Sequence, residues 1–227
     1  MSHLSGTPDG ARVAVVLAGC GYLDGAEINE AVISLLALNR AGARVQVFAP
    51  DMPQLHVVDH TTGAVVEGTR NVLTESARIV RGQVLPLARL SVDDFDAIFL
   101  PGGFGVAKNL STFATRGAEG AVEPDLAAAL RAFRAAGKPI GAVCIAPAVV
   151  VMALGEGQVT IGTQPGPAAA IEALGGAHTV CPVHEVLVDR ERRIATAPAF
   201  MEEAQLGDVA AGIERAVAAT LELVGAP

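Results

Sequence analysis

The sequence predicts an α/β fold, a three-layer sandwich in which a mainly parallel β-sheet is flanked by helices. Strand-like and helix-like segments alternate along the chain, which implies right-handed βαβ units. Several strand-like segments are apolar throughout, as strands covered on both faces are. The 227 residues, 51% of them hydrophobic, are enough to bury one large core. We therefore expect a single domain over residues 12–227 and a flexible N-terminal tail over residues 1–11.

The strands are expected where β-branched and apolar residues form short runs. In chain order these runs are residues 13–17, 44–48, 97–100, 139–143, 185–188 and 194–196.

The helices are expected where apolar residues recur every three or four positions. Ile28, Val32, Leu35 and Leu36 have this spacing, as do Leu206, Val209, Ile213, Val217 and Leu221. A third helix begins at Pro124, a favoured first-turn residue, and ends at Gly137. An apolar helix over residues 145–154 follows the fourth strand directly.

Two segments interrupt the alternation. Residues 55–67, with Thr-Thr-Gly in the middle, predict a β-hairpin that leads into a helix over residues 71–79. Residues 155–166 are rich in Gly, Pro and Thr and predict one short strand, 159–162, before a helix over residues 167–174.

Composition narrows the classes of ligand. The net charge is −8 and no run of Lys or Arg exceeds two residues, so the sequence predicts no nucleic-acid or anionic-lipid partner. The longest apolar stretches, such as residues 143–154, are shorter than the about 20 residues that span a bilayer. Three widely spaced cysteines favour reduced thiols over a disulfide framework, and hence a cytoplasmic protein. A small neutral or polar ligand fits these properties best.

Cys144 is the first candidate for chemistry. It ends the strand at 139–143 and is followed at once by an apolar helix, which is the order of a nucleophile elbow. Gly141, Ala142 and Ala146 are small enough for such a tight turn. The helix N-terminus would favour the thiolate, so we expect a pKa below the free-thiol value of about 8.5. The alternative is an inert cysteine packed as a small hydrophobic residue.

A run of glycines follows the third strand. Pro101-Gly102-Gly103-Phe104-Gly105 would expose unpaired backbone N–H groups, as an oxyanion hole requires. The alternative is a plain tight turn that needs glycine for a positive φ. Because ligands of open α/β sheets bind beyond the carboxyl ends of the strands, this run and Cys144 are expected at the same edge. Gly19-Cys20-Gly21, Glu27 and Glu30 follow the first strand and are expected there too.

These motifs resemble the ThiJ/PfpI superfamily of class I glutamine-amidotransferase-like proteins. The resemblance rests on residues 101–111, on Cys144 at its elbow and on Glu30 in the first helix, and it covers the chain from Val13 to about Val224. Residues 17–21, 69–73, 141–147 and 181–183 are similar to one subgroup, the ElbB-type glyoxalases, also called isoprenoid biosynthesis proteins with an amidotransferase-like domain. The resemblance implies a flavodoxin-like fold, no cofactor and a homodimer, with the apolar hairpin at 55–66 as a plausible interface.

The resemblance also implies roles for individual residues. Cys144 would be the nucleophile, Glu30 the acid that contacts its sulfur, and the amides of Gly103 and Ile145 an oxyanion hole. Glu27, one turn before Glu30, is the rival acid. The residues expected to bind substrate are Gly102, Asn109, Cys20 and Glu27.

The chain departs from the amidotransferase pattern in its histidines. Such relatives place a histidine directly after the nucleophile or on a neighbouring loop, whereas this chain has Ile145 and the loop Thr160-Ile161-Gly162-Thr163. His184 could reach a pocket, although a surface position at a strand start explains it equally well. Without a Cys–His pair, glutamine hydrolysis and proteolysis are disfavoured. No close ligand spacing predicts a metal site, and Gly19-Cys20-Gly21 lacks the third glycine of a dinucleotide-binding loop.

The function that the resemblance implies is a cofactor-free, glutathione-independent glyoxalase, a lyase of the hydro-lyase type that converts glyoxal, a small dicarbonyl, to glycolate. The alternative is a redox-sensing regulatory protein, associated with isoprenoid metabolism, in which Cys144 is oxidised and aldehyde activity is incidental. Repair of glycated amines would use the same chemistry as the glyoxalase.

Overall fold

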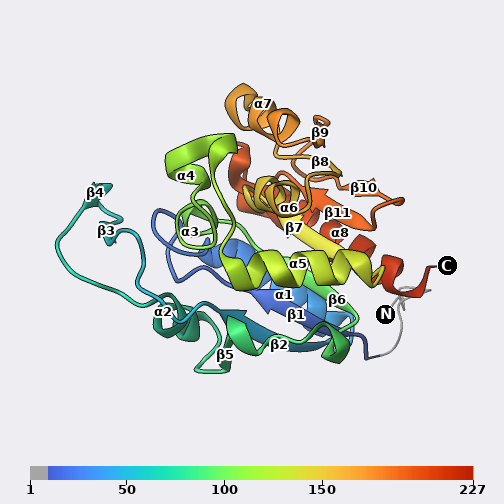
Figure 1. Ribbon diagram of the computed structural model, residues 1–227, viewed down its shortest axis with the longest axis horizontal. Coiled ribbons are helices and arrows are strands. Elements are labelled where there is room, and N and C mark those ends of the chain that lie inside the picture. The colour runs from blue at the N-terminus through green and yellow to red at the C-terminus, as the bar shows by residue number, and fades with distance from the viewer. Residues whose placement is uncertain (1–9, 227) are drawn as a thin grey trace.

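The protein, described here by a computed structural model over residues 10–226, is built on a seven-stranded sheet (Figure 1). The strand order is β10-β11-β7-β6-β1-β2-β5, and every neighbouring pair is parallel except β10 with β11. The expectation of a mainly parallel sheet is therefore confirmed. The strands are β1 (Arg12–Val16), β2 (Arg44–Ala49), β5 (Val84–Pro86), β6 (Ala97–Leu100), β7 (Ile140–Val143), β10 (Leu187–Asp189) and β11 (Ile194–Ala197).

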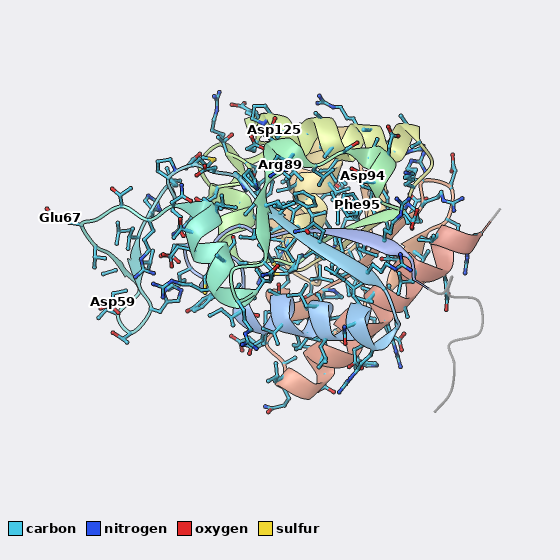
Figure 2. The ribbon with its side chains drawn as sticks, turned by 90° about the horizontal axis from the view of Figure 1, so that it is seen from below. Asp59, Glu67, Arg89, Asp94, Phe95 and Asp125 are labelled. Carbon is cyan, nitrogen blue, oxygen red and sulfur yellow. The ribbon has the colours of Figure 1, made fainter. Side chains whose placement is uncertain are left out.

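Helices cover both faces of this sheet (Figure 2). One apolar cluster joins the sheet to α1 and α8, and the other joins it to α5 and α6. Strand β1 shows why the strands are apolar throughout: Val13 and Val15 belong to the first cluster, and Ala14 and Val16 to the second. The helices are α1 (Ile28–Arg40), α2 (Val72–Ile79), α3 (Phe104–Lys108), α4 (Phe113–Arg116), α5 (Pro124–Ala135), α6 (Ala146–Leu154), α7 (Pro165–Ala173) and α8 (Leu206–Gly225). Four 3-10 turns add η1 (Leu87–Arg89), η2 (Val92–Asp94), η3 (Gly117–Glu119) and η4 (Ala199–Met201).

Two small sheets lie outside the main one. The expected hairpin is present as β3 (Val58–Asp59) and β4 (Ala64–Val65), and it extends away from the body of the molecule (Figures 1 and 2). The strand expected at 159–162 is instead β8 (Gln158–Val159), which pairs with β9 (Ala177–His178) and does not join the main sheet. The sequence analysis also missed β5, α3 and α4. Each is five residues or shorter, too short for a periodic pattern to emerge.

The apolar face expected for α1 is wrong at three of its four positions. Ile28, Val32 and Leu36 are 43–47% exposed, whereas Leu35 is partly buried and packs against the core. The buried residues are Glu30, Ala31, Ser34 and Leu38, and the helix packs against α8 and the sheet through this face. Because this face of α1 is turned inward, Glu30 lies in the interior, where it forms part of the site described below.

The N-terminal tail expected over residues 1–11 falls mostly, at residues 1–9, outside the described part of the chain. Ala11 belongs to the fold, since it is buried and its carbonyl accepts a hydrogen bond from the Arg44 amide at 2.8 Å. Within residues 10–226, the helices are all too short or too polar to cross a membrane.

Candidate active site

Cys144 occupies a strained turn between β7 and α6. Its φ is +61°, a left-handed conformation that costs a residue with a side chain about 1–2 kcal/mol. The Cys144 amide donates to the carbonyl of Ala197 at 3.1 Å, which ties the turn to the end of β11. The side chain is buried, with 7% of the residue exposed. The nucleophile elbow expected from the sequence is therefore present in its geometry.

Two backbone amides act on the sulfur of Cys144. Those of Gly103 and Ile145 both stabilise the thiolate and lower the pKa of Cys144. Gly103 has φ +102°, and a Cβ at this position would overlap the backbone of residues 25–27. The glycine is thus required both by its conformation and by the close approach of the loop after β1. The amides of Gly103 and Ile145 can hold negative charge on sulfur or on an adjacent oxygen.

Glu30 reaches the same sulfur from α1. The residue is fully buried, and its carboxyl lies beside the Cys144 thiol and interacts with it. Its Oε2 accepts from the Gly102 amide at 2.8 Å, and its Oε1 accepts from the Phe200 amide at 3.2 Å. A Cβ on Gly102 would lie 2.6 Å from Glu30 Oε2 and would overlap the side chain of Cys144. Only glycine at 102 lets these two side chains meet.

Burial raises the pKa of Glu30 to about 8, and the nearby charge of Glu27 adds to this effect. The hydrogen bonds from Phe200, Cys144 and Gly102 stabilise the carboxylate and oppose the rise, without cancelling it. At neutral pH, Glu30 is therefore mostly a neutral acid that can donate or accept a proton.

The pKa of Cys144 is raised well above its ordinary value, because burial disfavours the thiolate and the charge of Glu30 repels it. The amides of Gly103 and Ile145 act in the opposite direction but are outweighed. The expectation of a depressed pKa considered only the helix N-terminus and omitted desolvation. Cys144 and Glu30 titrate as a coupled pair, so the first negative charge belongs to both groups together.

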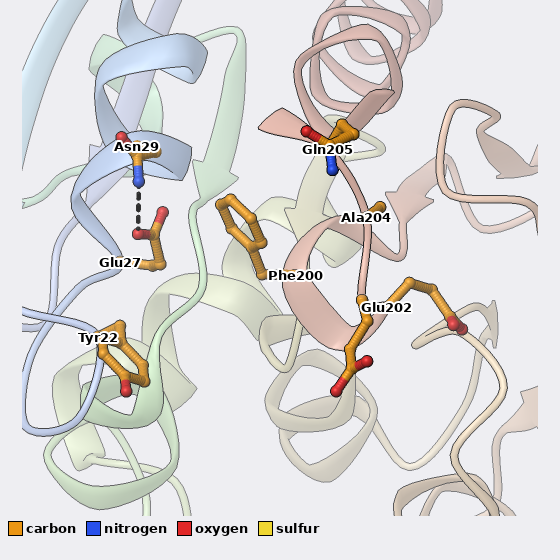
Figure 3. Close-up of a pocket in the computed structure, with 8 residues that line it drawn as sticks. Tyr22, Glu27, Asn29, Phe200, Glu202, Ala204 and Gln205 are labelled. Carbon is orange, nitrogen blue, oxygen red and sulfur yellow. Dashed lines mark hydrogen bonds between the residues drawn. The ribbon is translucent and has the colours of Figure 1, made fainter. Parts of the chain in front are cut away.

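Glu27 lies at the start of α1 and holds this arrangement in place. Its carboxylate accepts from the Glu30 amide at 2.6 Å and from Asn29 Nδ2 at 3.0 Å (Figure 3). Its own amide donates to the Gly102 carbonyl at 2.9 Å. Glu27 therefore caps the helix that carries Glu30, and Glu30, not Glu27, contacts the sulfur.

A cavity of about 660 Å³ lies between the start of α1 and the segment that follows β11 (Figure 3). Glu27 and Phe200 both contact Glu30 and both line the cavity. The lining consists of Tyr22, Glu27, Asn29, Phe200 and residues 202–205. The sequence analysis did not single out Phe200 or residues 202–205. Their position just after β11, at the carboxyl end of a parallel strand, is the feature that could have indicated them.

Three of the four residues expected to bind substrate, Gly102, Asn109 and Cys20, do not line the cavity, and neither do Cys144 and Glu30. Asn109 is buried, and its side-chain amide donates to the carbonyls of Ala18 and Asp24 and accepts from the Leu55 amide. These bonds use both N–H groups, so Asn109 joins three loops instead of facing a ligand. Burial raises the pKa of the Cys20 thiol, and the charge of Glu75 on α2 adds to this effect.

Within the described residues, no histidine interacts with Cys144 and the side chains form no cluster of metal ligands. No hydrogen bond joins a histidine to the Cys144 thiol within residues 10–226, and His184 is a half-exposed side chain near Glu185. In the same part of the chain, no group of three or more His, Cys, Asp or Glu side chains could hold a metal ion. The three cysteines are all free.

The model of the DJ-1/PfpI family matches residues 11–198. The chain is 49% identical, over 98% of its length and 87% of the relative's, to a human protein named glutamine amidotransferase-like class 1 domain-containing protein 3, mitochondrial. It is 34% identical to the mitochondrial ES1 protein of Danio rerio, over 85% and 77% of the two chains.

Solved structures agree with these matches. An isoprenoid biosynthesis protein with an amidotransferase-like domain from Ehrlichia chaffeensis superimposes with a TM-score of 0.88 at 40% identity, over 94% of this chain and 99% of the other. Drosophila melanogaster DJ-1β shares the fold at 20% identity, with a TM-score of 0.55 over 96% and 92% of the chains. With its elbow, glycine turn and flanking helices inside the matched segment, this chain belongs to the DJ-1/PfpI family.

Proposed function

We propose that this protein is a cofactor-independent glyoxalase that converts glyoxal and water to glycolate. The observation that carries the proposal is the buried pair of Cys144 and Glu30, whose side chains lie together beside Gly102 and near the amides of Gly103 and Ile145. A sulfur nucleophile, an acid whose pKa is about 8, and an oxyanion hole are the groups that carbonyl addition followed by proton transfer requires.

The reaction begins when Cys144 Sγ adds to one aldehyde carbon of glyoxal. The thiol proton passes to the Glu30 carboxylate, and the new oxyanion lies against the amides of Gly103 and Ile145. The oxyanion then takes this proton from Glu30, which gives the neutral hemithioacetal and restores the carboxylate. Loss of the thiol proton to a neighbouring carboxylate keeps the negative charge within the pair.

Glu30 then moves the proton that distinguishes the substrate from the product. As a carboxylate it removes the C–H proton of the hemithioacetal carbon, which yields an enediol, and it returns a proton to the second carbon. The first carbon is thereby oxidised to a thioester and the second reduced to an alcohol, so no external oxidant is needed. Water cleaves the C–S bond, releasing glycolate and restoring Cys144.

The absence of a Cys–His hydrogen bond within residues 10–226 favours this chemistry over amide hydrolysis. A leaving amine needs a general acid at the position that histidine takes in cysteine hydrolases. An aldehyde has no leaving group, so the carboxyl of Glu30 is sufficient.

Glyoxal turnover in D₂O tests the proposal. Proton transfer through an acid that exchanges with solvent predicts glycolate with one carbon-bound deuterium, detected by NMR. Glycolate without carbon-bound deuterium would indicate an internal hydride shift and contradict the role of Glu30. No glycolate at all, together with rapid oxidation of Cys144 by peroxide, would favour the redox-sensing alternative.

For partners and location we propose a homodimer in a thiol-reducing compartment. Leu55, Val65 and Val66 of the hairpin region are 42–61% exposed and are candidates for the dimer contact. The molecular mass in solution, compared with that of a Val65→Glu variant, tests this. Three free cysteines fit a reducing compartment. The mitochondrial names of the relatives give no support to the cytoplasm expected from the sequence.

A further inference from the structure

Part of the backbone that binds the Glu30 carboxyl is a short turn just after β11. The 3-10 turn η4 follows β11, and the amide of Phe200 within it donates to Glu30 Oε1 at 3.2 Å. This bond is one of two backbone bonds to the Glu30 carboxyl, the other coming from Gly102. The position of η4 therefore affects the acid of the site directly.

Because the backbone of η4 is strained, contacts with other residues must hold it in this conformation. Ala199 has φ +48°, a left-handed conformation for a residue with a side chain. Such a conformation is strained and persists only where the surrounding contacts enforce it. It directs the next amide, that of Phe200, toward Glu30. If the contacts were lost, relaxation of Ala199 would turn this amide away.

The contacts come from the loop before α7. Glu202 accepts hydrogen bonds from Thr163, at 2.5 Å from the amide to Oε1 and at 3.1 Å from Oγ1 to Oε2. Gln164 Nε2 donates to the Met201 carbonyl at 3.1 Å. Gly162 has φ +80°, and a Cβ there would overlap the Glu202 carboxylate, so the loop fits closely around this side chain.

We propose that Glu202 is a positioning residue for the reaction: its bonds to Thr163 hold η4 in its strained form and thereby keep the Phe200 amide on Glu30. This inference rests on the function proposed above. Glu202 lines the cavity, but its carboxylate is directed to the loop by its two bonds with Thr163.

The effect of this bond on Glu30 has a definite direction. The Phe200 amide stabilises the Glu30 carboxylate and lowers its pKa, so loss of the bond raises that pKa further. The titratable groups that face Glu30 are Cys144, from the turn after β7, and Glu27, at the start of α1. The glycine turn before α3 and η4 contribute backbone amides only.

The test compares Glu202→Ala with Glu202→Gln. Both variants remove the charge, but glutamine keeps an oxygen for the Thr163 amide and offers an N–H to Thr163 Oγ1. One readout is the rate of Cys144 alkylation by iodoacetamide as a function of pH, followed by mass spectrometry. The other is kcat/KM for glyoxal over the same range. Glu172→Ala, an exposed position on α7, is the matched control.

For Glu202→Ala we expect the midpoint of both pH profiles to move to higher pH, with kcat/KM at pH 7 falling by about tenfold. Glu202→Gln and Glu172→Ala should match the parent. Equal shifts in Glu202→Ala and Glu202→Gln would assign the effect to charge and overturn the proposal. Unchanged profiles in both would overturn it as well.

Two further outcomes distinguish a failure of this proposal from a failure of the proposed function and from misfolding of the variant. If the parent does not turn over glyoxal, the proposed function fails, but the alkylation profiles still test the role of Glu202. If Glu202→Ala does not fold, the double variant Thr163→Val with Gln164→Ala removes two of the three bonds to residues 201–202. It should shift the alkylation midpoint upward, and an unshifted midpoint would overturn the proposal.

Discussion

Glu30, a fully buried glutamate, lies beside the thiol of Cys144. Neither group has an ordinary pKa, since burial raises both. Because the two groups interact in a space without water, the protonation state of one determines the reactivity of the other. The predictions below address this pair.

Replacement of Cys144 by alanine should abolish glyoxal turnover, because no other group adds to the carbonyl. Circular dichroism should show an intact fold. Cys181→Ala is the matched control, since Cys181 is also free and also 7% exposed. Turnover by Cys144→Ala at the parental rate would refute the nucleophile assignment.

Activity of the parent should rise with pH through about 8, the pKa of Glu30, as the pair loses its first proton. In Glu30→Gln, no carboxylate can accept the thiol proton, so kcat/KM at pH 8 should fall by about 100-fold or more. The measurement is a pH profile of kcat/KM for both proteins. A profile of Glu30→Gln that coincides with that of the parent would exclude Glu30 from proton transfer.

The folded protein should become less stable over the pH range in which its activity rises, because both effects depend on the ionisation of Glu30. Glu30 titrates near 4.5 when exposed and near 8 in the folded protein. Between these values the folded state retains a proton that the unfolded state has lost, so stability falls as pH rises. The slope contributed by Glu30 is roughly 1.4 kcal/mol per pH unit across this window.

Urea unfolding at pH 5, 6, 7 and 8 measures this effect. Subtracting the unfolding free energy of the parent from that of Glu30→Gln cancels the contributions of other titrating groups. This difference should increase as pH rises, because the parent loses stability and the variant does not. A difference that stays constant with pH would show that Glu30 is already ionised at pH 5.

Glu27→Gln should shift the activity profile to lower pH. The charge of Glu27 raises the pKa of Glu30, and its removal relieves this repulsion. Glutamine retains an oxygen that can accept from the Glu30 amide, so the helix cap should persist and the thermal midpoint change little. An upward shift, as expected for Glu202→Ala, would contradict this sign.

Gly102→Ala should disrupt the site, because the added methyl group would overlap the Cys144 side chain and press on Glu30 Oε2. We expect a loss of kcat/KM of about 100-fold, as is common when reacting groups are displaced by about 1 Å. Gly166→Ala on α7 is the control, since a Cβ there meets no atom within 4 Å. Equal activity of the two variants would mean that Cys144 and Glu30 need not touch.

The sequence analysis was most reliable for the sheet and for the elbow. Runs such as residues 97–100 and 140–143 are apolar at every position, and strands covered on both faces need this pattern. Cys144 could be placed because the strand and helix on either side of it are both unambiguous. It also identified Gly102 and Gly103, whose close contacts exclude a Cβ.

The hydrophobic pattern of the sequence did not predict which face of α1 is buried. The spacing of Ile28, Val32 and Leu36 indicated a buried stripe, yet these side chains are exposed and Glu30 is buried in their place. A hydrophobic pattern assumes that apolar residues face the core. Here the helix turns its small residues and one acid inward, because that acid has three hydrogen-bonding partners in the interior.

What the sequence determined by itself is the order of the strands and helices and the local turn that carries Cys144, since both depend on short-range patterns. What only the tertiary structure decided is the environment of that cysteine. Burial and the charge of Glu30 on α1 raise the pKa of the thiol, whereas the backbone amides of Gly103 and Ile145 alone would lower it. Electrostatic energies depend on how completely water is excluded, and this is a property of the assembled fold.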